Sequence, residues 1–512
     1  MGADARENGT VEPDRTAGTP GVVSLAEAAD LDISLVGGKA AGLARMLALG
    51  LRVPPAFVLT SDVGRQVLRD GHLPAATLDA LRAGIADLES ATGRRFGGDD
   101  PLLVSVRSGA ATSMPGMMDT VLDVGFAPGT RAALAERDGE SFARSCHARF
   151  LAGYGAVVLG ADPPRTDDPD ALAAALGASV PSDPHRQLVD VVEAVFRSWE
   201  NERARAYRER HGVPHDLGTA VVVQAMVFGN RGAGSGAGVV SSRDPSTGAP
   251  GLCGDLLVDA QGEDVVAGTH DPRPITELCT RWPAVDAELR VAVAALEAAT
   301  RDMVDVEFTI DDGTLHLLQC RVGPRAAAAA VRVAVDLVDE GAISVSEALA
   351  RVSDDQLHHA SRPVAAGDGA TVLVAGLGAS PGVATGAVCL SAAHVPSHDG
   401  PVVLVRRETS PDDVQGMVDS AGVLTAHGGL VSHAALVARE LELPAVVGAE
   451  DLEVDEAGET VRAGGQVVRH GDIVTIDGTT GRVHLGAVPV VAPAPSEHLA
   501  RFRAWRAEIE PD

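Results

Sequence analysis

Residues 304–321 read Val-Asp-Val-Glu-Phe-Thr-Ile-Asp-Asp-Gly-Thr-Leu-His-Leu-Leu-Gln-Cys-Arg, which predicts two antiparallel strands around an Asp-Asp-Gly turn. Side chains alternate across a strand, so Asp305 and Glu307 share one face and the apolar residues between them take the other. Gln319 and Arg321 share a face of the return strand for the same reason. A three-residue turn with left-handed Gly313 would put all four polar side chains on one side, whereas a two-residue turn would split them. We expect the three-residue turn, because it gathers all four polar side chains into one site that could carry chemistry.

The polar face of this hairpin has the composition of a magnesium site. Asp305, Glu307 and Gln319 offer oxygen ligands on a rigid support, and Mg²⁺ keeps several waters while it bridges carboxylates to phosphates. Arg321 would then neutralise charge that develops on a transferred group. An ordinary solvated polar face is the alternative, and the residues of the hairpin leave it open.

Working outward from the hairpin, apolar strands alternate with helical stretches from about residue 21 to residue 340. Strands are predicted at residues 102–107 and 219–224, and helical spacing runs through residues 187–210. Alternation of this kind indicates an α/β fold. Residues from about 326 to 360 are expected to be helical and are Ala-rich, and residues 341–369 form the predicted helical linker. The last part of this linker, residues 361–369, has the composition of an exposed joint.

A smaller second domain is predicted at residues 370–491. It has short Val-rich strands, such as residues 402–405 and 472–476, and a helix after Ser432. Residues 492–512 are expected to form a C-terminal tail with one basic helical turn.

Composition narrows the class of protein. The chain has 512 residues, with 45% hydrophobic and 22% charged residues, as in ordinary globular proteins. Its net charge of −29 comes without a basic block, which argues against nucleic acid or an anionic membrane as partner. Five scattered cysteines fit a reducing cytosol, and no apolar run reaches the roughly 18 residues of a membrane span. We expect the polar residues 1–20 to be a disordered leader.

Lysine occurs once in this chain, at Lys39 within Leu35-Val-Gly-Gly-Lys-Ala-Ala-Gly42, and the rest of the 42 basic residues are arginine. Lysine is a compact point charge, whereas arginine is a broad planar fork. A glycine turn lets the backbone approach an anion closely, and a small cation fits beside it. The pattern favours a phosphate contact; the alternative is a single lysine that survived by chance.

A second candidate phosphate loop begins at Arg107, where the strand at residues 102–107 ends. Residues 105–120 read Ser-Val-Arg-Ser-Gly-Ala-Ala-Thr-Ser-Met-Pro-Gly-Met-Met-Asp-Thr. Amides and hydroxyls can surround phosphate oxygens, arginine can bind them bidentately, and the Met and Pro side chains suit a mobile cover over a nucleotide. A loop packed on the core is the alternative.

His433 is the candidate nucleophile. It follows Gly428-Gly429 and Ser432, a suitable N-cap, so a helix is predicted to begin at the histidine. The positive end of the helix dipole disfavours imidazolium and would stabilise an attached phosphoryl group. A structural histidine is the alternative.

Taken together, these segments closely resemble the pyruvate phosphate dikinase family, from about residue 35 to residue 490. The most specific part is Met114-Pro-Gly-Met-Met-Asp-Thr120, which separates this chain from phosphoenolpyruvate synthases and rifampicin phosphotransferases of the same fold. The other matching segments, besides the hairpin, are Val36-Gly-Gly-Lys39, Val53-Pro-Pro55, Pro214-His-Asp-Leu-Gly-Thr219, Val227-Phe-Gly-Asn230, Arg243-Asp-Pro-Ser-Thr-Gly248 and Ala260-Gln-Gly-Glu-Asp-Val-Val-Ala-Gly268.

The resemblance implies an ATP-grasp domain at residues 21–340 and a swivelling β/β/α phosphohistidine domain at residues 370–491. In the family, ATP phosphorylates a histidine in a first partial reaction that involves inorganic phosphate and leaves AMP and pyrophosphate. The histidine domain then swings to a separate barrel that transfers the phosphoryl group to pyruvate. The roles carried over to this sequence are ATP binding by Lys39, Arg107, Met226, Val227, Glu307 and Gln319, Mg²⁺ binding by Asp305, Glu307 and Gln319, and catalysis by His433, Arg107 and Arg321.

Three departures from the family pattern stand out. Val431 replaces a regulatory threonine two residues before the histidine, so that control cannot operate there. Asp255 stands where glutamate, one methylene longer, is common, which puts a possible phosphate or metal contact at this position in doubt and leaves its role open. The chain also ends about where the barrel that binds pyruvate or phosphoenolpyruvate would begin.

We therefore predict a cytoplasmic, Mg²⁺-dependent enzyme that phosphorylates His433 from ATP, with the barrel supplied by another chain. One alternative is transfer to a different small acceptor. Another is a phosphocarrier or nucleotide-sensing module without turnover of its own.

Overall fold

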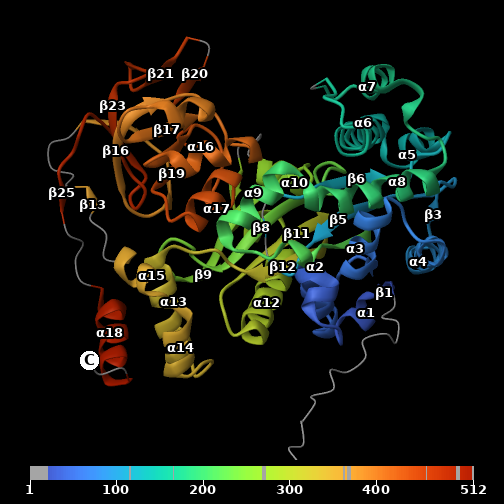
Figure 1. Ribbon diagram of the computed structural model, residues 1–512, viewed down its shortest axis with the longest axis horizontal. Coiled ribbons are helices and arrows are strands. Elements are labelled where there is room, and N and C mark those ends of the chain that lie inside the picture. Colours follow the sequence, from blue (N-terminus) through green and yellow to red (C-terminus); the bar gives the residue numbers. More distant parts are fainter. Residues whose placement is uncertain are drawn as a thin grey trace, which may run out of the picture.

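The computed structural model describes residues 21–509 except 113, 115–116, 165, 268–271, 361–363, 366–370, 457 and 492–495. The expected leader at residues 1–20 and most of the joint at residues 361–369 lie outside these residues. Helices and strands alternate along the described chain, which confirms the expected α/β class. Figure 1 shows strands β14–β24 gathered in a smaller body beside a larger body that contains β1–β12.

The larger body contains two five-stranded sheets, and all their strand pairs are antiparallel. The first has the order β1-β2-β7-β5-β6, with β1 Val22–Ser24, β2 Ala56–Leu59, β5 Val104–Gly109, β6 Thr120–Val124 and β7 Ala220–Ala225. The second has the order β10-β9-β8-β11-β12, with β8 Gly236–Arg243, β9 Pro250–Val258, β10 Arg273–Pro274, β11 Val304–Asp311 and β12 Thr314–Val322.

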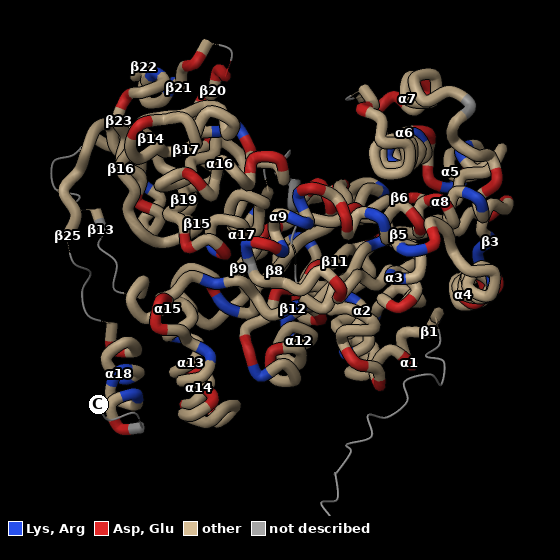
Figure 2. Tube along the Cα trace, in the orientation of Figure 1, with Lys and Arg blue, Asp and Glu red and all other residues tan. Residues whose placement is uncertain are grey.

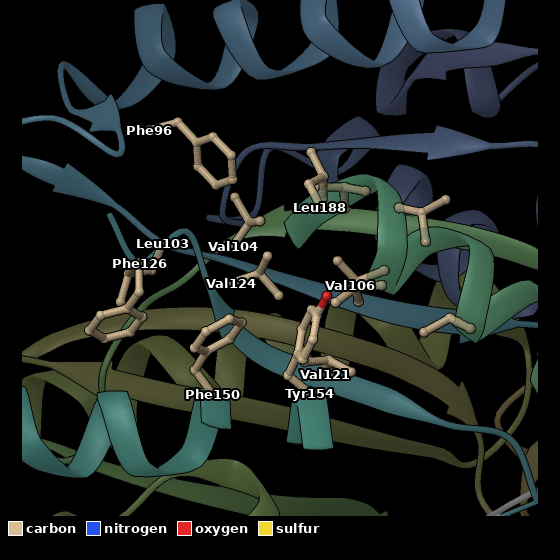
Figure 3. Packing of buried hydrophobic residues seen from close by; sticks show 14 of the residues in the cluster. Phe96, Leu103, Val104, Val106, Val121, Val124, Phe126, Phe150, Tyr154 and Leu188 are labelled. Atoms are coloured by element: carbon tan, nitrogen blue, oxygen red, sulfur yellow. The ribbon is translucent and has the colours of Figure 1, made fainter. Parts of the chain in front are cut away.

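Strand β7 shows why the first sheet is buried on both faces. Val221 and Val223 point into one apolar cluster, and Val222 points into a second cluster on the other face. A run of valines is therefore apolar on both sides of the pleat. Figure 3 shows part of the first cluster, where Phe150 and Tyr154 pack near strand residues such as Val124.

Twelve α-helices belong to this body in the described chain. They are α1 Leu25–Ala28, α2 Ile33–Ala48, α3 Ser61–Asp70, α4 Ala75–Thr92, α5 Thr130–Asp138, α6 Glu140–Val157, α7 Pro169–Leu176, α8 Pro184–Arg197, α9 Glu202–His211, α10 Gly262–Ala267, α11 Leu278–Arg281 and α12 Pro283–Thr300. The helical stretch predicted at residues 187–210 is thus two helices, because the chain leaves the α-helical path between Ser198 and Asn201.

The β11–β12 turn differs from the expected one. Asp311 pairs with Thr314, so the turn has two residues, and the three-residue turn is wrong. Asp312 and Gly313 have φ values of 48° and 73°. Positive φ at both central residues matches the twist of paired strands, which is the reason that Asp-Gly favours the shorter turn.

A β-bulge nevertheless places the four polar side chains on one face. The register shifts after Glu307, where Leu318 is an extra residue in β12. The pairs beyond the bulge are Glu307–Gln319 and Asp305–Arg321. The prediction that the four polar side chains share one face is therefore correct, but the bulge produces this arrangement and the three-residue turn does not.

The smaller body is built on an eight-stranded sheet with the order β14-β24-β23-β16-β17-β18-β19-β15, in which β16, β17, β18 and β19 are parallel. Its strands are β14 Val372–Ala375, β15 Leu377–Ser380, β16 Val383–Cys389, β17 Val402–Arg406, β18 Gly422–Thr425, β19 Ala445–Val447, β23 Ile473–Asp477 and β24 Arg482–Leu485. Its helices are α16 Val414–Asp419 and α17 His433–Glu440. A small sheet is formed by β20 Glu453–Asp455, β21 Thr460–Ala463 and β22 Gln466–Arg469.

Helices α13 Ala327–Asp339, α14 Val345–Arg351 and α15 Asp354–His359 lead from one body to the other. Strand β13 Val364–Ala365, on the way in, pairs with β25 Val490–Val491, on the way out. The C-terminal segment is more than the one helical turn expected, since α18 Glu497–Ile509 spans 13 residues and packs through Phe502 on α13 and α14. A helix of this length is only marginally stable in isolation, so the apolar contact stabilises α18.

No helix in the described parts of the chain combines the length and apolar character needed to cross a bilayer. Acidic and basic positions are interspersed over both bodies in Figure 2, in keeping with the absence of a basic block from the sequence.

Candidate active site

Lys39 lies in α2 just beyond a kink at Gly37. Gly37 has φ 77° and ψ 160° inside the helix, and a Cβ atom built on it would lie 1.7 Å from the carbonyl oxygen of Gly109. Glycine alone permits both the conformation and the contact. The kink therefore brings the start of α2 against the end of β5, the strand that carries Arg107.

The Lys39 amine lies in a desolvated environment with other positive charges. Burial, and secondarily the charge of Arg107, lowers the pKa of Lys39 from 10.5 to about 7, with a smaller contribution from Arg321 and an opposing one from Glu307. Near neutral pH the amine is thus on the point of losing its proton. A bound anion would favour the charged form.

Arg107 joins β5 to the hairpin. Its Nη2 donates to Glu307 Oε2 at 3.0 Å and to Gln319 Oε1 at 3.2 Å. Its Nη1 donates to the carbonyl oxygen of Leu318 at 3.3 Å, so the bulge that sets the register also binds this arginine. The polar cluster of Lys39, Arg107, Asp305, Glu307, Gln319 and Arg321 thereby unites residues from the two sheets and α2.

Asp305 and Arg321 complete the polar cluster. Asp305 accepts a 2.6 Å hydrogen bond from Ser241 Oγ of β8, and its other carboxylate oxygen is 3.6 Å from Arg321 Nη2. Asp305 is 3% exposed, so its charge is compensated mainly by these neighbours.

The oxygen atoms of Asp305, Glu307 and Gln319 form a hard donor set that fits a divalent cation such as Mg²⁺. Within the described residues, no group of three or more His, Cys, Asp and Glu side chains is arranged to hold a metal ion. A cation here would therefore need phosphate or water oxygens in addition, as Mg²⁺ commonly does.

Met226 and Val227 follow β7 and are half-buried, and the Met226 N–H donates to the carbonyl of Leu103 at 2.9 Å. Their contact with adenine stays a prediction. In the loop that the sequence predicts as a cover over the nucleotide, Met114 and Met117 are buried in an apolar cluster, which agrees with the alternative of a loop packed on the core. Ser113, Pro115 and Gly116 lie outside the described residues.

His433 is the first residue of α17, and Ser432 is its N-cap, as the sequence predicts. The ring is 8% exposed, and its Nε2 has no hydrogen-bond partner among the described residues. Burial lowers the pKa of His433 from 6.5 to about 4, with Asp413 opposing the shift. The imidazole is therefore neutral at physiological pH, and burial is the main reason.

Thr409 is a site residue that the sequence reasoning missed. Its Oγ1 is 3.0 Å from Nδ1 of His433, in a buried contact. When the hydroxyl accepts a hydrogen bond from Nδ1–H, the lone pair of the ring is on Nε2. Thr409 is 24 positions from the histidine, and no local motif signals the contact.

The His433 helix is docked on the larger body. The Val431 N–H donates to Asp255 Oδ2 of β9 at 3.1 Å, and the Val431 side chain lies in an apolar cluster with residues of β8, β9 and α10. Figure 1 shows α17 next to β8 and β9. Asp255, whose role the sequence left open, thus contacts the loop that precedes the histidine.

Comparison with known proteins gives two family matches. The family described as "Pyruvate phosphate dikinase, AMP/ATP-binding domain" matches residues 33–83 and 65–289, and "PEP-utilising enzyme, mobile domain" matches residues 398–481.

Full-length relatives give the same assignment. This chain is 41% identical to a "Pyruvate, phosphate dikinase" of Rhizobium meliloti (strain 1021), over 94% of this chain and 59% of that protein. It is 40% identical to a "Pyruvate, phosphate dikinase" of Clostridium symbiosum, over 92% of this chain and 58% of that protein. The chain therefore spans less than two thirds of the length of these relatives.

Proposed function

Because this chain belongs to the pyruvate phosphate dikinase family, we propose that it transfers a phosphoryl group from ATP to His433. Inorganic phosphate is the second substrate, and AMP and pyrophosphate are the products. The observation that carries the proposal is the neutral His433, with Nε2 unpartnered among the described residues, on a helix docked against the larger body.

In the proposed reaction, the Nε2 lone pair attacks the β-phosphorus of ATP. The bond between that phosphorus and the α–β bridging oxygen breaks, and the oxygen leaves on AMP. The γ-phosphoryl group passes to inorganic phosphate as pyrophosphate, which leaves the β-phosphoryl group on the histidine. Thr409 keeps Nδ1 protonated and the ring oriented, and Lys39, Arg107 and Arg321 offset negative charge on the transferred group.

Asp305, Glu307 and Gln319 are the residues that would hold Mg²⁺, whose charge would draw phosphate oxygens into one orientation. Arg107, which binds two of these three side chains, would then be free to turn toward phosphate.

The onward acceptor belongs to the proposal as well. We expect pyruvate to receive the phosphoryl group on a barrel domain, in the cytoplasm. The basis for pyruvate is the relatives, which are named for it.

Labelled ATP tests the proposal directly. We expect the β-label, but not the γ-label, to become acid-labile protein-bound phosphate, with AMP released and a dependence on inorganic phosphate. His433→Ala should abolish the label, and the matched control His470→Ala, an exposed histidine of the same body, should keep it. A stable nucleotide complex without label would instead indicate a sensor, and labelled protein that donates only to another acceptor would exclude pyruvate.

A further inference from the structure

The two carboxylate oxygens of Asp305 lie in different surroundings. Oδ1 accepts a 2.6 Å hydrogen bond from Ser241 Oγ, whereas Oδ2 is 3.6 Å from Arg321 Nη2, which is beyond the length of a hydrogen bond. We propose that Ser241 is a positioning residue that restricts Asp305 to binding a cation through Oδ2 alone, and that it thereby favours Mg²⁺ over Ca²⁺. The inference rests on the proposed function, because it concerns the metal ion of the ATP site.

Strand pairing places the serine beside the carboxylate. Ser241 in β8 lies directly opposite Asp305 in β11, and Asp305 lies opposite Arg321 in β12. Residues directly opposite each other in paired strands project to the same face of a sheet. The three side chains therefore form one row across the sheet. Ser241 is 1% exposed, so water does not compete for its hydrogen bond to the carboxylate.

The surroundings of Oδ1 leave this oxygen little room for a cation. A Cβ atom built on Gly323 would lie 2.8 Å from Asp305 Oδ1 and 3.0 Å from Met303 Cε, so the backbone at Gly323 closes one side. The Ser241 hydroxyl occupies another side. Its 2.6 Å length is that of a charge-assisted hydrogen bond, which is roughly twice as strong as a neutral one. The protein therefore holds Oδ1, and Oδ2 is the oxygen left for a metal ion.

The neighbouring carboxylate, Glu307, is held in a different way. The residue opposite it in β8 is Val239, whose side chain offers no hydrogen bond. Glu307 Oε2 accepts from Arg107, and its side chain is 27% exposed, against 4% for Asp305. Arg107 would turn toward bound phosphate, and Glu307 can then rearrange, whereas the neutral serine stays on Asp305. Asp305 is therefore the fixed ligand of the pair, and Glu307 is the adaptable one.

A carboxylate that offers one oxygen suits Mg²⁺ better than Ca²⁺. Mg²⁺ demands a nearly octahedral shell at roughly 2.0–2.1 Å, whereas Ca²⁺ takes about six to eight oxygens and accepts both oxygens of one carboxylate. Release of Oδ1 would add a ligand that Ca²⁺ can use and that does not fit the Mg²⁺ shell. The Ser241 hydroxyl therefore discriminates between two ions of equal charge.

Metal binding to the complex of the full chain with α,β-methylene ATP tests the proposal without turnover, because this analogue cannot break between its α- and β-phosphorus atoms. Electron paramagnetic resonance of bound Mn²⁺ reports on the site, and displacement of Mn²⁺ by Mg²⁺ and by Ca²⁺ gives both affinities. We expect Ser241→Ala to weaken Mg²⁺ binding by about tenfold, as is usual when the group that orients a metal ligand is removed. Ca²⁺ binding should not weaken, so the preference for Mg²⁺ should fall by at least about tenfold.

Two further serine variants serve as controls. Ser241→Thr keeps the hydroxyl group and should restore the wild-type preference for Mg²⁺. Ser242→Ala removes the next hydroxyl of β8, which accepts from the Val304 N–H at 3.1 Å and belongs to the other side of the pleat. Its thermal midpoint should fall, because that hydrogen bond is lost, and its metal preference should match that of the wild type.

The outcomes decide the proposal. A wild-type preference for Mg²⁺ in Ser241→Ala would overturn it, and so would an equal loss of Mg²⁺ and Ca²⁺ affinity, because the serine would then support the site without discriminating. Absence of Mn²⁺ binding by the wild-type complex, or undiminished binding in Asp305→Ala, would overturn it as well. Labelling of His433 by ATP decides the proposed function separately. Label with a preference that ignores Ser241 refutes only this inference, and a Ser241-dependent preference without label refutes only the proposed function.

Discussion

At the residue scale, the neighbours of His433 determine which ring nitrogen reacts. Nδ1 is 3.0 Å from Thr409 Oγ1, while Nε2 is buried without a partner in the described chain. Thr409→Val keeps the shape and removes the hydroxyl, so Nδ1 loses the group that fixes its proton. We expect about tenfold slower labelling from ATP in single-turnover experiments. Thr409→Ser should recover most of the rate, and a Thr409→Val variant at full rate would show that the hydroxyl is dispensable.

Lys39 provides a prediction about pH. Its pKa is lowered to about 7, so the amine is charged below that pH and neutral above it. A polyanion binds the charged form of the amine better, so the affinity for ATP should fall as the pH rises through 7. At pH 7–8 the binding of ATP should be accompanied by uptake of a proton by the Lys39 amine. Calorimetry in buffers of different ionisation enthalpy would measure the uptake. Lys39→Met should remove it; uptake that persists in Lys39→Met would assign the proton to another group.

At the element scale, the hairpin separates what the sequence can and cannot predict. Alternation correctly placed Asp305 and Glu307 opposite Val306, which lies in the apolar core. The prediction of a three-residue turn was wrong, because a two-residue turn with positive φ at both residues fits the twist of the paired strands better. The signal that could have revealed the bulge is Leu317-Leu318, where two adjacent leucines break the alternation of β12.

The bulge itself can be tested by deleting Leu318. Removing this extra residue leaves the pairs Glu307–Gln319 and Phe308–Leu317 adjacent, so the four polar side chains should stay on one face while the carbonyl that accepts from Arg107 is lost. We expect the deletion variant to bind ATP about tenfold more weakly in equilibrium titrations, the size of one lost hydrogen bond. Leu318→Ala keeps that carbonyl and should bind ATP nearly as the wild type does. Complete loss of ATP binding in the deletion variant would mean that the polar face itself depends on the bulge.

At the scale of the whole molecule, the sequence predicted the parts of the site better than their assembly. The N-cap at Ser432 and the start of α17 depend on adjacent residues, and both were predicted correctly. The contact of Val431 with Asp255 spans 176 positions, and nothing local encodes it. The sequence indicates only that Val431 lacks a hydroxyl group, whereas in the structure its apolar side chain packs in a cluster with residues of the larger body.

The helix that follows the smaller body allows a last prediction at this scale. The chain crosses into and out of that body through the β13–β25 pair, and α18 then packs on α13. Phe502 is 1% exposed in that contact, so Phe502→Ala should destabilise the helical unit by about 3–5 kcal/mol. Calorimetry should show an earlier transition, while labelling of His433 at low temperature persists. Glu508→Ala, an exposed change on the same helix, is the control. An unchanged transition in Phe502→Ala would show that α18 adds nothing to the stability of α13, and loss of labelling would show that it also sets the position of the smaller body.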